Sequence, residues 1–255
     1  MNRYRSLAAL LCAAVLSSCE KNAVQDITGT LPGARIKFFN FGVNAPGVNF
    51  YANDTKMTAI SSSTGTESTT GTVYGGAGGA GVYSGIAPGQ YAVTGKIAAT
   101  TDNNLAISTV TATIADGKYY SYFLSGFYDP TAKTVDAFIV EDPLSPQIDY
   151  AVAYVRFVNA MSNANPMALY ATSPITGEIA VGAAVPYKGA GAFTSLPNGV
   201  YDLSTRYAGS GTNVISKTQV SFSAGRVYTI GARGDITVTS TTATNRPFLD
   251  NSLNR

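Results

Sequence analysis

The sequence contains no histidine and no tryptophan, and its only two cysteines, Cys12 and Cys19, lie near the N-terminus. The rest of the chain therefore has no imidazole base, no thiol nucleophile and no disulfide, and it lacks the nitrogen and sulfur ligands of zinc sites. Charge is also scarce, because charged residues make up 13% of the chain against about 25% in typical soluble domains. A domain of this composition has to be stabilised by core burial and strand pairing.

The charge balance offers no general attraction for phosphate. The formal net charge is +2, and Arg3 and Arg5 lie in the first 18 residues, which contain no acid. The remainder of the chain is therefore neutral. We expect no nucleic acid partner and no polybasic membrane-surface patch.

The N-terminus resembles a bacterial lipoprotein signal peptide. The two arginines precede an apolar stretch at 7–16, which is too short to span about 30 Å of hydrocarbon as a helix. Leu16-Ser17-Ser18-Cys19 then resembles the lipobox, in which the cysteine accepts the lipid before cleavage. We predict that Cys19 anchors the protein to the outer membrane, on its periplasmic or its surface side. Glu20-Lys21-Asn22 resembles the surface-export signal of Bacteroidota lipoproteins, with a single acid.

The body of the chain contains an internal repeat. Four stations occur twice in the same order, and the first copy has extra residues, mainly between Ser61 and Gly81. The matching stations are 35–40 and 154–159, 44–52 and 163–171, 88–91 and 197–201, and 114–120 and 222–228.

Each copy has the pattern of short β-strands. Ile36 and Phe38 alternate with Lys37, and Val155 and Phe157 alternate with Arg156, as in half-buried strands. About seven strands per ~100 residues predict an all-β fold of two tandem immunoglobulin-like β-sandwich domains. The last strands are expected at Thr134–Val140 and Ile236–Thr239. The predicted segments are a signal peptide (1–18), a lipidated tether (19–33), a first sandwich (34–142), a linker (143–150), a second sandwich (151–241) and a C-terminal tail (242–255).

These stations resemble the bacterial domain of unknown function 4397 (DUF4397) family. The resemblance depends on the opening strand R-[IV]-[KR]-F-x-N, the following loop with Ala and Pro, the Pro-x-G-x-Tyr station and the final hairpin. It covers 34–141 and 152–240, and the second copy departs from it at Asn165-Pro166. It implies an anchored or secreted envelope protein and no catalytic residues.

Three sequence features resemble sites for chemistry, and none predicts an enzyme, a metal or a cofactor. Gly76–Gly81 matches G-x-G-x-x-G but leads into a strand, which indicates a flexible loop. Glu141 and Asp142 are adjacent, so their side chains should point to opposite faces of a strand. Asp102-Asn103-Asn104 lacks the spacing of a calcium loop and is typical of a polar hairpin tip.

Tyrosines are the candidate ligand-binding residues. Tyr119, Tyr120 and Tyr122 are close in sequence, with Tyr120 and Tyr122 on one strand face and Tyr119 on the other. Tyrosine is common at interfaces, but it also packs across sheets. The leading hypothesis is a non-enzymatic binding or adhesion module with a protein or glycan partner. A structural spacer and a carbohydrate-processing accessory protein are the alternatives.

Overall fold

The computed structural model describes residues 33–58 and 70–255, which fall within one compact unit of the chain. The predicted signal peptide and Cys19 lie outside the described residues. The all-β prediction is confirmed, because strands dominate and form four sheets in a sandwich-like arrangement. None of the helical elements within 33–58 and 70–255 is long and apolar enough to cross a membrane.

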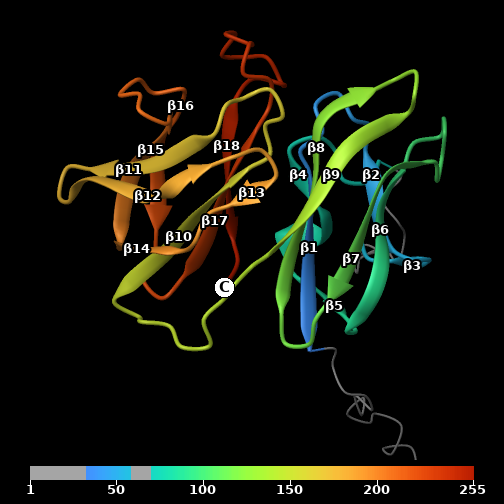
Figure 1. Ribbon diagram of the computed structural model, residues 1–255, viewed down its shortest axis with the longest axis horizontal. Coiled ribbons are helices and arrows are strands. Elements are labelled where there is room, and N and C mark those ends of the chain that lie inside the picture. Colours follow the sequence, from blue (N-terminus) through green and yellow to red (C-terminus); the bar gives the residue numbers. More distant parts are fainter. Residues whose placement is uncertain (1–32, 59–69) are drawn as a thin grey trace, which may run out of the picture. The chain divides into compact units, whose positions relative to one another are not determined.

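The first half contains two sheets, drawn from blue to green in Figure 1. One sheet has the order β4-β1-β8-β9, with β5 also pairing with β1, and the other has the order β3-β2-β6-β7. The elements are β1 (Ala34–Asn40), β2 (Val48–Ala52), β3 (Thr55–Lys56), β4 (Gly76–Ala77), the 3-10 helix η2 (Gly78–Gly81), β5 (Ser84–Ile86), β6 (Gly89–Ile97), β7 (Ala106–Ile114), β8 (Tyr119–Asp129) and β9 (Thr134–Glu141).

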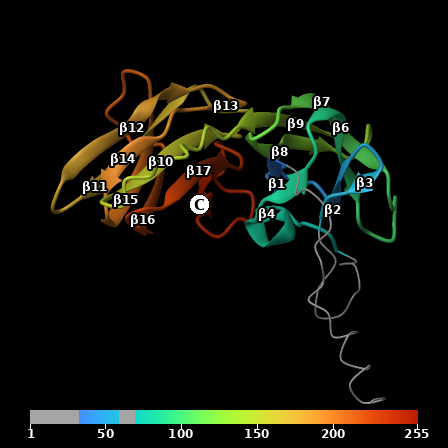
Figure 2. The same cartoon turned by 90° about the horizontal axis from the view of Figure 1, so that it is seen from below.

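The second half repeats this order, and both views show its strands in yellow to red as a separate set (Figures 1 and 2). Its sheets have the orders β13-β10-β17-β18, with β14 also pairing with β10, and β12-β11-β15-β16. The elements are β10 (Val152–Asn159), β11 (Met167–Ser173), β12 (Gly177–Val185), β13 (Gly189–Ala190), β14 (Thr194–Pro197), β15 (Gly199–Tyr207), β16 (Ile215–Phe222), β17 (Val227–Arg233) and β18 (Phe248–Leu253).

The strand registers of the two halves are also equivalent. β1 pairs in parallel with β8 so that Lys37 lies opposite Ser121, and β10 pairs in parallel with β17 so that Arg156 lies opposite Thr229. All other pairs between named strands are antiparallel. Each position in one half can therefore be assigned a counterpart in the other half from strand pairing alone.

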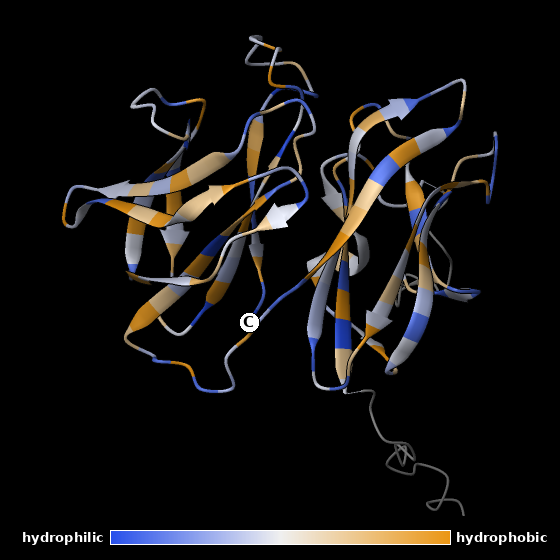
Figure 3. Cartoon of the chain, in the orientation of Figure 1, coloured by the Kyte–Doolittle hydropathy of each residue, from blue (hydrophilic) through white to orange (hydrophobic). Residues whose placement is uncertain are grey.

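Each half has its own hydrophobic core between its two sheets. Figure 3 shows the apolar residues as orange bands along the strands. Alternate residues of a strand face the same side, and the buried apolar ones form these cores. In the first half Ile36, Phe38 and Tyr122 are buried, and in the second half Val155 and Phe157 are buried.

A third apolar cluster joins the two halves. It contains Phe39, Phe41, Phe123 and Phe138 from the first half with Val158 and Ala160 from the second. The outer face of β1 and β10 is therefore covered, and the prediction of half-buried strands is wrong for these two. Lys37 is 1% exposed and Arg156 is 0% exposed, because each lies on the face that contacts the other half.

The C-terminal strand is not where the sequence predicted it. Residues 236–239 form a turn and loop, since the Asp235 side chain accepts hydrogen bonds from the backbone and hydroxyl of Thr237 and its carbonyl accepts one from the Val238 amide. The strand is instead β18, which pairs with β17 and lies within the predicted tail 242–255. The tail therefore belongs to the second sandwich.

Candidate functional site

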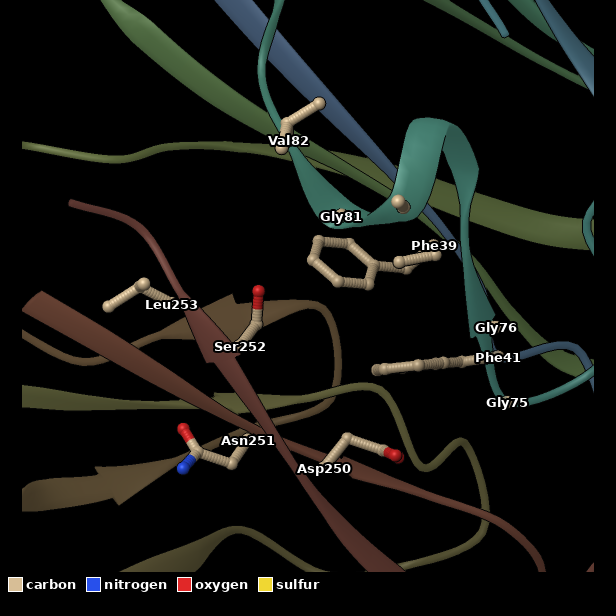
Figure 4. A pocket seen from close by; sticks show the side chains of 12 residues that line it. Phe39, Phe41, Gly75, Gly76, Gly81, Val82, Asp250, Asn251, Ser252 and Leu253 are labelled. Carbon is tan, nitrogen blue, oxygen red and sulfur yellow. The ribbon is translucent and has the colours of Figure 1, made fainter. Parts of the chain in front are cut away.

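A pocket opens between the glycine-rich segment of the first half and β18 of the second (Figure 4). Its volume is about 330 Å³, near the lower end of the usual range for ligand pockets. Phe39 and Phe41 contribute rings, residues 75–77 and 80–82 form one wall, and Asp250–Leu253 form the other.

The glycine-rich wall has a backbone that requires glycine. Gly75 has a positive φ of 77°, and a Cβ there would lie 2.8 Å from a guanidinium nitrogen of Arg233. The segment continues through η2 into extended backbone at Val82, so the G-x-G-x-x-G match does not open an α-helix. The sequence indicated a flexible loop here and missed that the segment lines a pocket.

The opposite wall contains an ion pair. Arg233 Nε lies 2.5 Å from Asp250 Oδ2, and its guanidinium lies over the rings of Tyr74 and Phe248 at 4.8 and 4.9 Å. Burial raises the pKa of Asp250, while the neighbouring Arg233 lowers it. Asp250 is the only ionisable residue among those lining this pocket, and it already has a partner.

The pocket combines a buried apolar floor with an exposed apolar rim. Phe39 and Phe41 are 4% and 2% exposed, whereas Val82 and Leu253 are 65% and 48% exposed. Exposed apolar side chains next to a concave surface are typical of binding sites. This arrangement suits binding of an apolar group, and it provides no paired acid and base for bond-breaking chemistry.

A buried charge network lies at the junction beside the pocket. Arg156 and Asp142 form an ion pair in which both side chains are 0% exposed. Tyr83 Oη and Ser121 Oγ donate to Asp142 Oδ2 at 2.6 and 2.7 Å, and Arg156 Nε donates to Thr229 Oγ1 at 3.0 Å. Each charge is therefore compensated inside the protein.

Lys37 of β1 and Arg156 of β10 each reach across the junction to the end of a strand in the other half. The Lys37 ammonium donates to the Leu253 carbonyl and to Asn254 Oδ1, at the end of β18, and lies 4.3 Å from the centre of the Tyr83 ring. Arg156 in the same way donates to the Glu141 carbonyl, at the end of β9. Burial lowers the pKa of Lys37 to about 8, with a further lowering from Arg156 and an opposing contribution from Asp142.

This shift predicts a pH dependence of stability. Between about pH 8 and the ordinary lysine value of 10.5, the unfolded chain binds more protons at Lys37 than the folded protein does. The contribution of Lys37 to the free energy of unfolding should therefore rise with pH, by on the order of 1–2 kcal/mol between pH 8 and 10. Tyr83 and Tyr122, whose pKa values burial raises, contribute in the opposite direction near pH 10. The difference in stability between the wild type and Lys37→Met, measured by urea unfolding, should therefore shift in favour of the wild type across this interval. Equal profiles for the two proteins would contradict the assignment.

The structure places the three candidate tyrosines in different surroundings. Tyr122 is fully buried, and its hydroxyl lies 2.7 Å from Ser108 Oγ in the first core. Tyr120 is 8% exposed and accepts a hydrogen bond from the Ala115 amide. Tyr119 faces the other way and packs edge-on against Tyr83. Tyr120 and Tyr122 are therefore packing residues of the first core, as tyrosines in strands often are.

The acidic residues singled out in the sequence, Glu141, Asp142 and Asp102, have different surroundings. Asp142 is buried, whereas Glu141 is exposed and pairs with Lys118. Asp102 pairs with Lys133 near the tip of the β6–β7 hairpin. Within the part of the chain that the structure describes, no three acidic, histidine or cysteine side chains come together as metal ligands. Cys19 lies outside the described residues.

Residues 153–253, from β10 to β18, match the family model described as Domain of unknown function (DUF4397). The match supports the resemblance found in the sequence, and it includes β18. No curated protein matches the chain. The description of the family names no activity, so function has to be argued from the geometry.

Proposed function

We propose that this protein is a membrane-anchored cell-envelope lipoprotein that acts as a non-enzymatic binding module. The observation that supports binding most directly is the apolar pocket, whose walls come from β18 and from the glycine-rich segment of the other half. The lipobox ending at Cys19 supports the anchor. The partner is a protein or a glycan, and it approaches the pocket from the rim formed by Val82 and Leu253.

The proposal includes a second DUF4397 domain in the first half. The two halves share strand order and register, and they share buried polar positions. Asn40 and Asn159 show this at the end of β1 and β10. Each side-chain oxygen accepts a hydrogen bond from the backbone amide two residues later, at Gly42 and Met161.

A structural spacer is the second candidate. The buried pair of Arg156 and Asp142 and the apolar cluster at the junction favour a fixed connection between the halves, as a spacer needs. Binding experiments distinguish these two candidate functions. A binding module retains a defined glycan from an array or a purified envelope protein, whereas a spacer retains neither and loses its role only when its length is changed.

The anchor has a direct test. We expect Cys19→Ala to abolish incorporation of labelled fatty acid and to release the protein from the membrane fraction, because the thiol is the acceptor and acyl chains supply about 0.8 kcal/mol per buried methylene. Cys12→Ala, in the apolar stretch, is the matched control and should leave labelling unchanged. Continued labelling of Cys19→Ala would show that the anchor is elsewhere.

A further inference from the structure

We infer that the pocket is a subsite for a single aromatic ring. The inference rests on the proposed binding function and specifies the chemistry that the module recognises. It comes from comparing the pocket with its counterpart on the opposite side of the junction, where the same space is filled by the protein's own side chains.

Strand pairing identifies the counterpart residues. Phe123 of β8 lies opposite Phe138 of β9, and Gly231 of β17 lies opposite Asp250 of β18. Phe123 and Gly231 are themselves equivalent, since they pair with Phe39 of β1 and Val158 of β10. Asp250 therefore occupies the position that Phe138 has in the first half, and Ser252 occupies that of Val140.

The first-half side of the junction is filled by aromatic rings. Phe138 stacks on Phe123 with 5.1 Å between ring centres, and Phe123 stacks on Phe39 at 4.7 Å. Tyr187 closes this side, with its ring 6.3 Å from Phe138 and its hydroxyl 2.9 Å from Ser125 Oγ. The protein thus packs the phenyl ring of Phe138 into the apolar cluster between the two halves.

On the pocket side that ring is missing. Phe41 occupies the space over Gly231, where a Cβ would come within 2.9 Å of its ring. Nothing replaces Phe138, because the Asp250 side chain pairs with Arg233 and Ser252 presents only a hydroxyl (Figure 4). The space is continuous with the aromatic cluster, since Phe39 and Phe41 belong to both.

The surroundings favour a ring that also carries a polar group. Phe39 and Phe41 can stack with it, as aromatic pairs prefer offset or edge-on contacts. The Ser252 hydroxyl and the Asp250 carboxylate lie on the opposite wall and can accept a hydrogen bond from a phenol or an amide. Such a ring can be part of a free aromatic compound or of a tyrosine side chain in a peptide.

Ligand-observed NMR on the purified full-length protein tests the inference with three probes: 4-methylphenol, N-acetyl-tyrosinamide and cyclohexanol. We expect saturable binding of at least one aromatic probe in the millimolar range, and binding of cyclohexanol at least about tenfold weaker. Binding of only 4-methylphenol would support a small-molecule source of the ring, and binding of only N-acetyl-tyrosinamide a peptide source. Equal binding of cyclohexanol, or no binding of any probe, would overturn the inference.

A variant that fills the pocket tests whether the aromatic probes bind there. Ser252→Phe should weaken aromatic binding at least about tenfold, because the new ring occupies the space that Phe138 fills on the other side. Ser221→Phe makes the same change at an exposed position of β16 and should bind like the wild type. Ser252→Val, which introduces the residue found at Val140, gives a smaller change if Ser252→Phe is poorly folded. Wild-type affinity in folded Ser252 variants would overturn the assignment, whereas retention of a glycan or envelope protein would still support the proposed function.

Discussion

Replacing Asp142 by alanine is expected to lower the free energy of unfolding by about 3–5 kcal/mol. The change leaves the guanidinium of Arg156 fully buried without its counter-charge, and it removes the acceptor for the hydroxyls of Tyr83 and Ser121. The energy arises from the desolvated charge that remains rather than from the attraction that is lost. Urea unfolding at neutral pH, monitored by tyrosine fluorescence and by circular dichroism, measures the change.

A neighbouring ion pair provides the control. Lys118 and Glu141 are 52% and 42% exposed, so water screens their attraction and Lys118→Ala should change stability far less than Asp142→Ala does. The double variant Asp142→Leu with Arg156→Met removes both buried charges and should recover much of the loss, because well-packed apolar residues often replace a buried pair without cost. A loss below about 1 kcal/mol for Asp142→Ala would mean that Arg156 reaches water and that the junction opens.

The junction matters for function because the pocket depends on it. One wall belongs to the first half and the other to β18 of the second, and Lys37 ties the end of β18 to β1. A variant that separates the halves should therefore lose aromatic binding even if both cores stay folded. The same contacts explain why the described residues, 33–58 and 70–255, fall into one compact unit in spite of two separate cores.

The strands were predictable because their pattern is local. Alternation along 35–40 and 154–159 places the opening strand of each copy from neighbouring residues alone. β18 was missed because Ile236–Thr239 has the same local composition as a strand, and the side chain of Asp235 turns it into a loop. Its true position became visible only through pairing with β17.

The site was not predictable for a different reason. Alternation placed Lys37 and Arg156 on the solvent face, since a pattern cannot show that another half of the chain covers that face. The pocket depends on a difference between two equivalent positions, Phe138 and Asp250, and that equivalence needs the strand registers. Tyrosine clustering pointed instead to Tyr120 and Tyr122, whose rings are core residues.

Phe123→Ala should have an effect of similar size, a loss of about 3–5 kcal/mol, because it removes a fully buried ring from the centre of the aromatic stack. Phe39 and Phe138 both lose their stacking partner, and the cavity lies between the halves rather than inside either core. Phe127→Ala, on the same strand but 44% exposed, is the matched control and should cost less than about 1 kcal/mol.

The shape of the Phe123→Ala transition tests how the halves are coupled. If the junction makes them one cooperative unit, a single shifted transition should be seen by all probes, with an unchanged dependence on urea. Two transitions, with the second half unfolding as in the wild type, would show that the halves fold independently and meet only afterwards. In that case the pocket would form after folding by docking of two finished domains, and aromatic ligands should stabilise the docked state rather than either half.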